Sequence, residues 1–565
     1  MDGTILPDAV AQRNLPPVEL WPKLTVPMGY DAKLPASLNL ASEVLDRNVA
    51  LGRRNKIAIF HDEQRYTYGD LVRASNRIAA ALVELGVKPF DRVALRFPNT
   101  PEAIIANFGV LKAGALPVTV HPRWSRKEIA YVVNDADAHY LMTHARADIL
   151  GEVEAAKPEF RGFKNLILMG DEKVAGERGY LAYEALLRRG TPTFEPITHR
   201  KNEAAFILYT SGTTGFPKGV IHTLEGVLAV TDSVGKAVWK FEDNDVLGTP
   251  APLTFALGYG ALALIPYRFG ISVSLMTRPD PEYVLSTIEK HGVTVFTTSP
   301  TFYRQTIPLL DQLLKKYSIG SLRLCTGGGE AVGVETIERW HNKTGLTIYE
   351  GFGATEVYYI VISNAVDAKD AKPGSVGKPI PGVEVKVLDR ETKEIRGVGE
   401  GQLLIRGPTG TIYWNPYAHD EHLLKKMKDD VKFGYVALGD AVRIDEDGRV
   451  WFIGRGEDVI KSSGYRIGPD EIEGALLSHP AVADAGVVGV PHDVRNEDVV
   501  AFVVLRKGQV PSDQLKDELQ AHLQTRVAKY KLPRGIFFVE SLPRTSAGKL
   551  LRKQLRETAK QHPSA

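Results

Sequence analysis

Short apolar runs alternate with longer amphipathic segments along most of this 565-residue chain, and this alternation constrains the fold more than any other feature. Apolar runs at 92–96, 115–120, 294–298 and 322–325 have the length of buried strands, and residues 68–85 read as a helix. Strands that are separated by helices form parallel sheets whose faces the helices cover. The sequence therefore predicts an α/β protein with mainly parallel sheets.

The pattern changes after Gly382. Residues 383–388 and 401–405 alternate apolar with polar side chains, as half-exposed strands do. We expect a β-rich subdomain that ends near Phe452.

A polar, glycine-bearing stretch at 454–458 separates this subdomain from the last part of the chain. There the pattern predicts helices and strands in a small α+β unit. The expected helices span 470–478 and 512–527, and the expected strands span 485–490 and 499–505. We predict a large domain at 1–455 that consists of several subdomains, and a small mobile α+β domain at 456–565.

Composition excludes several classes of protein. The chain has 70 Lys and Arg against 68 Asp and Glu, a formal net charge of +2, which does not suggest a nucleic-acid-binding protein. The single Cys325 reads as a buried strand residue and cannot form an intramolecular disulfide. The most apolar long stretch, 258–275, is interrupted by Pro266 and Arg268 and reads as core. We expect a cytoplasmic enzyme with no signal peptide and no membrane span.

The strongest local signal is the stretch 207–220, ILYTSGTTGFPKGV. An apolar strand leads into glycines, hydroxyl side chains and Lys218. Glycines let backbone N–H groups converge on an anion, the hydroxyls add donors and the lysine adds charge. The spacing differs from a Walker A loop. The stretch therefore predicts a phosphate-binding loop.

This loop resembles that of the adenylate-forming superfamily, which includes acyl-CoA synthetases, adenylation domains of peptide synthetases and firefly luciferase. Further segments resemble signatures of the same family in the same order along the chain. They are Tyr349-Glu-Gly-Phe-Gly-Ala-Thr-Glu356, Gly439-Asp440, Gly454-Arg455, Lys461-Ser-Ser-Gly-Tyr-Arg-Ile-Gly-Pro469 and Pro543-Arg-Thr-Ser-Ala-Gly-Lys549.

The resemblance implies a site for ATP and Mg²⁺. Thr355 and Glu356 would meet the α-phosphate and the metal, and Asp440 would accept the ribose hydroxyls with help from Arg455. Lys549 would offset the negative charge that gathers when a carboxylate attacks the α-phosphate. The residues implied to bind ATP or AMP are Thr210, Ser211, Gly212, Thr213, Thr214, Lys218, Gly328, Gly329, Glu330, Glu350, Gly351, Phe352, Asp440 and Arg455.

A second half-reaction with coenzyme A is implied by the segment 461–469. Gly464 would give clearance to the pantetheine arm, Tyr465 lies beside it, and Arg466 would meet phosphate. The small domain would rotate about a hinge between the two steps. At the hinge the family usually has Asp, and this chain has Glu457; Leu438 stands where Thr or Ser is common.

The region of the acid pocket resembles benzoate- and 2-aminobenzoate-CoA ligases. Two positions differ: Leu257 stands where benzoate ligases carry Tyr, and Tyr359 stands where they carry His. The Tyr359 hydroxyl could bond a substituted acid, or its ring could shorten the pocket for a short branched or hydroxylated aliphatic acid. Tyr359 could also be ordinary core. The residues expected at the acyl pocket are His222, Ala256, Leu257, Gly258, Gly353, Tyr359 and Ile360.

The resemblance thus implies an ATP-dependent acyl-CoA ligase that releases AMP and pyrophosphate, with an aromatic acid expected first and a short aliphatic acid as the alternative. A stand-alone adenylation domain that loads a carrier protein is the alternative from another class. The implied partners are the acid, ATP and CoA, with a homodimer and a lysine acetyltransferase acting on Lys549 also compatible with the sequence. Arg552, Lys553 and Arg556 are expected to form a solvated helix face.

Overall fold

The structure is a computed structural model. It describes residues 20–26, 34–210, 217–389, 392–410, 412–414, 421–456, 458–462, 465–492, 496–544 and 550–561.

The first large sheet has the strand order β11-β10-β5-β4-β6-β7-β8. All neighbours in it are parallel except β10 and β11, which form an antiparallel pair around the predicted phosphate loop. Its strands are β4 (Arg92–Arg96), β5 (Leu116–Thr119), β6 (Ala138–His144), β7 (Asn165–Met169), β8 (Leu181–Ala182), β10 (Ala204–Tyr209) and β11 (Gly219–Thr223).

The second large sheet has the order β18-β17-β16-β15-β14-β12-β13-β2-β3, with a parallel centre and antiparallel strands at both edges. Its strands are β2 (Ile57–His61), β3 (Gln64–Thr67), β12 (Val246–Thr249), β13 (Ser272–Leu275), β14 (Val295–Thr298), β15 (Leu324–Gly328), β16 (Ile348–Gly353), β17 (Ile360–Ser363) and β18 (Lys378–Pro379). A separate short pair joins β1 (Ser37–Leu38) to β9 (His199–Arg200).

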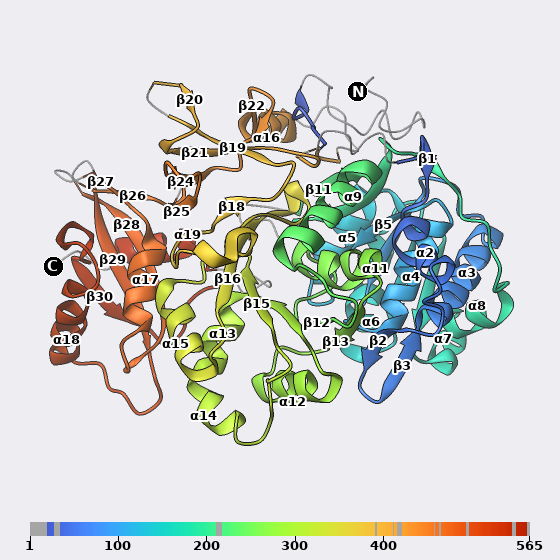
Figure 1. The fold of residues 1–565 in the computed structure, drawn as a ribbon, viewed down its shortest axis with the longest axis horizontal. Helices are drawn as coiled ribbons and strands as arrows, with labels where there is room; N and C mark the ends of the chain where they lie inside the picture. Colours follow the sequence, from blue (N-terminus) through green and yellow to red (C-terminus); the bar gives the residue numbers. More distant parts are fainter. Residues whose placement is uncertain are drawn as a thin grey trace.

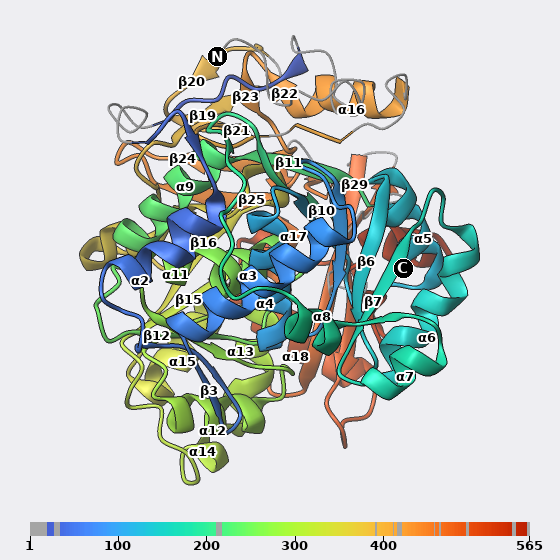
Figure 2. The ribbon, with the colours of Figure 1, turned by 90° about the vertical axis from the view of Figure 1, so that its right-hand side faces the viewer.

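Helices α3 (Tyr68–Glu84) and α4 (Pro101–Lys112) lie between these two sheets, and their apolar faces share one core with both (Figure 2). Other helices cover the outer faces, so apolar strands are buried on both sides. These and the remaining helices of this part are α2 (Arg47–Ala50), α5 (Arg126–Asp135), α6 (Ala147–Ala156), α7 (Glu172–Glu177), α8 (Tyr183–Arg189), α9 (Leu224–Ser233), α10 (Ala256–Tyr259), α11 (Ile265–Phe269), α12 (Pro281–His291), α13 (Pro300–Thr306), α14 (Leu310–Leu313) and α15 (Val334–Thr344).

An antiparallel sheet follows, at the top of Figure 1. It contains β19 (Glu384–Leu388), β20 (Ile395–Arg396), β21 (Gly399–Arg406), β22 (Val431–Lys432), β23 (Tyr435–Val436), β24 (Asp440–Ile444) and β25 (Val450–Arg455), with α16 (Glu421–Asp430) beside it.

The last sheet lies at the left of Figure 1 with its own helices. Its strands are β26 (Ile460–Ser462), β27 (Tyr465–Ile467), β28 (Val482–His492), β29 (Asn496–Leu505) and β30 (Gly535–Phe538), and its helices are α17 (Pro469–Leu477), α18 (Asp513–Gln524) and α19 (Arg552–Gln561). The Ser512 hydroxyl accepts a hydrogen bond from the Leu515 N–H and caps α18.

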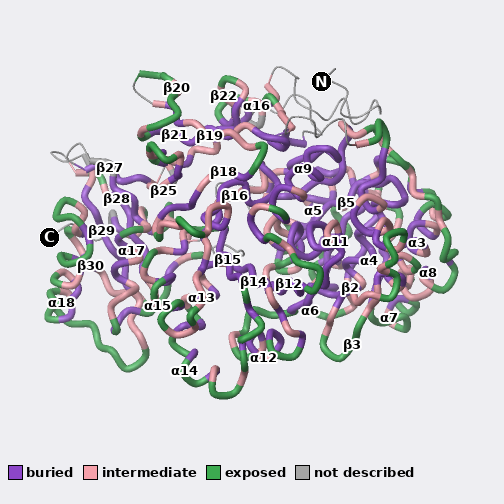
Figure 3. The backbone as a smooth tube through the Cα atoms, viewed as in Figure 1, coloured by how far each residue is buried: buried purple, intermediate pink, exposed green. Residues whose placement is uncertain are grey.

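The predicted α/β class is confirmed, and burial follows the predicted strands (Figure 3). Two expectations need correction. The strand expected at 322–325 runs from Leu324 to Gly328 and so continues through Gly327 and Gly328. Arg552 and Arg556 do not form a solvated face, because both make ion pairs with Asp458; only Lys553 is exposed as expected. Among the described residues, none of the helices combines the length and apolarity that a membrane crossing requires.

Candidate active site

A cavity of about 1930 Å³ lies where the carboxyl ends of β15 and β16 meet the antiparallel sheet and the C-terminal helices. Its wall includes Gly329, Glu356 and Asp440 from the larger part of the chain, and Asp470 and Arg552 from the C-terminal part. Ligands of open α/β sheets bind at the carboxyl ends of the strands. The cavity is therefore the candidate active site.

The base of the predicted phosphate loop stands at the wall of this cavity. Thr210 follows β10 and Lys218 precedes β11, and their backbones pair: the Thr210 N–H donates to the Lys218 carbonyl at 2.9 Å. The Lys218 N–H donates to the Thr210 hydroxyl at 3.3 Å. The loop is thus closed at its base as a hairpin. Ser211, Gly212, Thr213 and Thr214 lie outside the described residues.

The glycine-rich stretch after β15 forms another wall. Gly328 is still a strand residue, and an added Cβ there would lie 3.0 Å from the Gly351 carbonyl oxygen of β16. Gly329 starts the loop with φ of +96°, which favours glycine. The Glu330 carboxylate accepts hydrogen bonds from Thr301 at 2.6 Å and Arg304 at 3.0 Å, so α13 holds it at the cavity.

Strand β16 contributes Glu350, Gly351 and Phe352 to the wall. Glu350 is 3 % exposed, and its carboxylate accepts the Val332 N–H at 3.1 Å. Burial raises the pKa of Glu350 to about 7, so near neutral pH this side chain exists in both protonation states. Glu350 can therefore either donate or accept a hydrogen bond at the cavity.

After β16, a tight turn separates Glu356, expected at the phosphate and metal site, from Tyr359, expected at the acid pocket. Thr355 and Glu356 lie in the 3₁₀ turn η8 (Thr355–Val357) and line the cavity. The Tyr359 N–H then bonds the Val357 carbonyl at 2.9 Å across Tyr358, which has φ of 71°. Such a γ-turn at a non-glycine residue stores about 1–3 kcal/mol of strain. It reverses the chain, so Glu356 reaches the cavity while Tyr359 is buried.

The carboxylate of Glu356 has neighbours that the sequence did not indicate. The Tyr413 hydroxyl donates its single proton to Asp430 at 2.7 Å and lies 3.3 Å from the Glu356 Oε1. Burial first, then the two carboxylates, raises the pKa of Tyr413 well above its usual value. The phenol therefore stays protonated, and its shorter hydrogen bond is the one to Asp430. Glu356, which lines the cavity, keeps lone pairs for other partners.

Asp440 and Arg455 stand opposite each other on β24 and β25, as their expected shared role requires. Asp440 is 3 % exposed and lines the cavity. Gly439 before it has φ of +92°, a conformation that favours glycine and explains the Gly-Asp pair.

The residues expected at the acyl pocket gather in one aromatic region. His222 on β11 lies 5.6 Å from Tyr358 between ring centroids, and both rings pack near Phe206. Burial lowers the pKa of His222 to about 3, so its ring is neutral. Ile360 begins β17 beside Tyr359, and Gly258 approaches the Pro252 carbonyl so closely that a Cβ would lie 2.0 Å from its oxygen.

Tyr359 fills the distal end of this region. Its ring lies 5.5 Å from that of Trp239 in an edge-to-face contact, and a Cβ on Gly260 would lie 2.3 Å from it. Of the seven expected pocket residues, only Gly353 is among the described residues that line the cavity; Ala256 and Leu257 are half-buried nearby. In this arrangement Tyr359 is therefore a core residue and does not line the cavity.

Trp239, Thr297 and Thr326 are further residues of this region that the sequence did not single out. Thr297 and Thr326 are neighbours across β14 and β15, and Trp239 contacts Tyr359. The Trp239 indole N–H and the side-chain hydroxyls of Thr297, Thr326 and Tyr359 are buried and make no hydrogen bond within the described part of the chain. For Thr297 and Thr326, the one sequence feature that could have indicated them is a threonine near the carboxyl end of a buried strand.

Several residues expected at the site cannot be placed at the cavity. Lys549, the hinge residue Glu457 and Gly464 lie outside the described residues. Tyr465 and Arg466 lie in β27, where Arg466 pairs in register with Lys461 of β26.

Comparisons with known proteins identify the fold and its chemistry. Residues 45–414 match the AMP-binding enzyme family, and residues 471–549 match the AMP-binding enzyme C-terminal domain. The chain is 31% identical to a benzoate–CoA ligase of Thauera aromatica, over 93% of this chain and 97% of that protein. It is 33% identical to an acetyl-coenzyme A synthetase of Pyrobaculum aerophilum, over 92% of this chain and 83% of that protein.

Among solved structures, the anthranilate CoA ligase AuaEII in complex with anthranoyl-AMP superposes with a TM-score of 0.86. It is 31% identical and covers 94% of this chain and 99% of its own. The chain therefore belongs to the AMP-binding enzyme family, as an adenylate-forming acyl-CoA ligase.

Proposed function

We propose that this ligase acts on an aromatic carboxylic acid of the benzoate or 2-aminobenzoate type. The observation that carries the proposal is the backbone likeness to the anthranilate ligase with its acyl adenylate, at a TM-score of 0.86 over 94% of the chain. The aromatic lining around His222, Tyr358 and Tyr359 supports it, because aromatic rings pack well on one another.

The first half-reaction would join the acid to AMP. The carboxylate is ionised at neutral pH, so no base is needed, and its oxygen attacks the α-phosphorus while the bond to pyrophosphate breaks. Asp440 would hold the ribose, Thr355 and Lys218 would bind phosphate oxygens, and Lys549 would offset the developing charge. In the second half-reaction the CoA sulfur attacks the acyl carbonyl and AMP leaves.

The residues at the cavity fit a magnesium ion bound together with ATP. Mg²⁺ is held in such sites by one or two carboxylates and by substrate phosphates. Glu356 meets that need, because the Tyr413 proton goes to Asp430 and leaves the Glu356 lone pairs available. When bound, the ion would neutralise phosphate charge.

The position of Tyr359 favours a second class of substrate, a short aliphatic acid. The Tyr359 ring packs against Gly260 and Trp239, and an acid pocket that ended at this ring would suit a short branched or hydroxylated aliphatic acid. Unpaired polar atoms of Tyr359 and Thr297 lie at this end, and a hydroxyl on the acid would satisfy groups that are costly to leave unmet.

The test is CoA-dependent AMP release from a panel of acids: benzoate, 2-aminobenzoate, acetate, a short branched acid and a short hydroxy acid. We expect kcat/KM for the preferred aromatic acid to exceed that for acetate by about tenfold or more. A preference for the short branched or hydroxy acid would replace the proposal by its alternative. Acyl transfer to a carrier protein but not to CoA would indicate the other class.

A further inference from the structure

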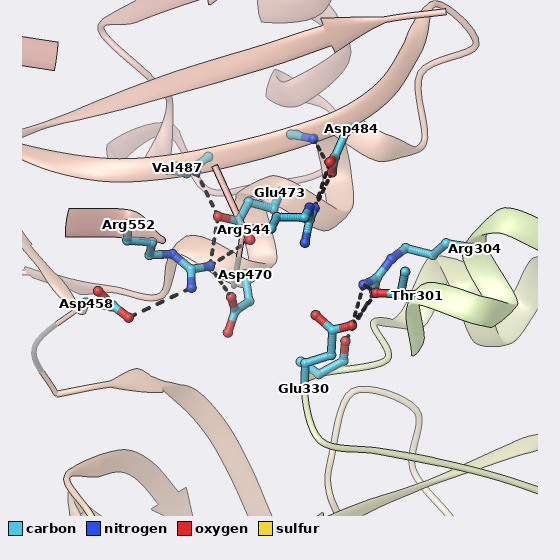
Figure 4. A network of polar contacts seen from close by, with 12 residues as sticks. Thr301, Arg304, Glu330, Asp458, Asp470, Glu473, Asp484, Val487, Arg544 and Arg552 are labelled. Carbon is cyan, nitrogen blue, oxygen red and sulfur yellow. Dashed lines mark hydrogen bonds and ion pairs between the residues drawn. The ribbon is translucent and has the colours of Figure 1, made fainter. Parts of the chain in front are cut away.

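A cluster of charged side chains joins α17, α19 and the segment after β25. Arg552 stands at its centre: its Nη2 donates to Asp470 at 2.6 Å and to both Glu473 oxygens at 2.7 and 2.8 Å. Its Nη1 forms an ion pair with Asp458 at 3.8 Å, and Arg556 also pairs with Asp458. Figure 4 shows Arg552 directed at the three carboxylates.

This cluster is shielded from water. The side chains of Arg552 and Asp458 are each 15% exposed, and that of Glu473 is 13% exposed. Glu473 also accepts the Val487 N–H of β28 at 2.8 Å, which fixes the carboxylate to the sheet. Charged hydrogen bonds of this kind hold a defined geometry, in contrast to exposed pairs that exchange freely with water.

Two of the partners of Arg552, Asp458 and Asp470, lie beside segments with separate expected roles. Asp458 directly follows the expected hinge residue Glu457, and Asp470 lies in the first turn of α17, just after the CoA-step segment. Arg552 itself begins α19, three residues after Lys549. One guanidinium therefore connects the expected hinge, the CoA-step segment and the chain next to the expected catalytic lysine.

The chain around Lys549 is tied down on both sides. Arg544 and Leu550 form an antiparallel bridge, and the Leu551 N–H donates to the Pro543 carbonyl at 2.9 Å. Before the loop, Arg544 binds Asp484 through two hydrogen bonds of 2.7 and 2.8 Å. After it, Leu550 packs in a small apolar core, and Arg552 anchors α19.

We propose that Arg552 is a positioning residue for adenylation: it holds the start of α19, three residues after the expected catalytic Lys549, against Asp458 and α17. The inference rests on the proposed role of Lys549. Because Leu550 is bonded to Lys549 and consecutive Cα atoms are about 3.8 Å apart, a shift of α19 is transmitted directly to the lysine.

The test measures the two half-reactions separately in Arg552→Gln, with ATP–pyrophosphate exchange for adenylation and thioester formation from a synthetic acyl adenylate for the CoA step. We expect kcat for exchange to fall about 10- to 100-fold, because a misplacement of about 1 Å can cost about 10²-fold. Arg552 lies on the cavity wall, but its guanidinium is engaged by Asp470, Glu473 and Asp458. KM for ATP should therefore stay within about twofold of that of the wild-type enzyme, and the CoA step within about threefold.

Three further variants test whether the contacts of the Arg552 side chain account for the loss of exchange. Arg552→Lys keeps the charge and should restore most of the exchange rate, whereas Asp458→Asn removes the link to the hinge side and should lower exchange while Arg552 keeps two partners. The matched control is Lys516→Met, which removes an ion pair with Asp513 on α18, away from the cavity wall, and leaves the cluster intact. It should change neither half-reaction.

Lys549→Ala separates failure of the inference from failure of the proposed function. If this variant keeps full exchange, the proposed role of the lysine fails. If it loses exchange while Arg552→Gln does not, or if Arg552→Gln slows both half-reactions equally while remaining folded by circular dichroism, the positioning role is wrong.

Discussion

At the scale of single residues, Gly260 lies directly against the ring of Tyr359, one of the residues expected at the acid pocket. A Cβ on Gly260 would lie 2.3 Å from the Tyr359 ring, so one of the two must move. Gly260→Ala should lower the free energy of unfolding by about 1–3 kcal/mol, the usual cost of overpacking a core. Denaturant unfolding measures this loss.

The control for this prediction is a double-mutant cycle with Tyr359→Ala. Removing the ring opens the space, so Gly260→Ala should cost little in that background, and the coupling should exceed about 0.5 kcal/mol. Equal costs in both backgrounds would contradict the packing of Tyr359 on Gly260.

At the scale of elements, the approach of α17 to β25 sets how the C-terminal part docks. Gly468 is the N-cap of α17, and an added Cβ there would lie 1.9 Å from the Ile453 carbonyl oxygen of β25. Because the clashing atom belongs to the backbone, relieving the clash requires a backbone shift. Gly468→Ala should therefore disfavour this docked arrangement, seen as faster limited proteolysis after β25, where loosened segments are cut. Gly474→Ala is the matched control, because a Cβ there meets nothing within 4 Å. Equal cleavage of the two variants would refute the docking role.

At the scale of the whole molecule, buried titratable groups give stability a pH dependence. His222 has its pKa lowered from 6.5 to about 3 by burial, so its contribution is complete above pH 6.5 and is lost as the pH falls toward 3. Glu350 makes the free energy of unfolding depend on pH in the opposite direction. Its pKa is raised from 4.5 to about 7, so its contribution to stability is present below pH 4.5 and is lost as the pH rises through 7.

A comparison of variants isolates the histidine. Between pH 7 and pH 5 the wild-type protein should lose about 2 kcal/mol more unfolding free energy than His222→Gln, which does not titrate. Chemical denaturation at the two pH values measures the difference. Parallel changes in both proteins would mean that His222 is protonated in the folded state.

The sequence by itself determined the α/β class and most strand positions, because periodicity is a local property that does not depend on distant packing. Its resemblance to the adenylate-forming family pointed to Lys218, Glu356 and Asp440, which line the cavity. Tertiary structure alone decided the partners. Tyr413 meets Glu356 across 57 residues, and Arg552 meets Asp470 across 82. The polar pattern of α19 looks like a solvated face, yet burial against α17 turns Arg552 into an anchor. Which charges lose water depends on how helices pack, and no local pattern encodes that.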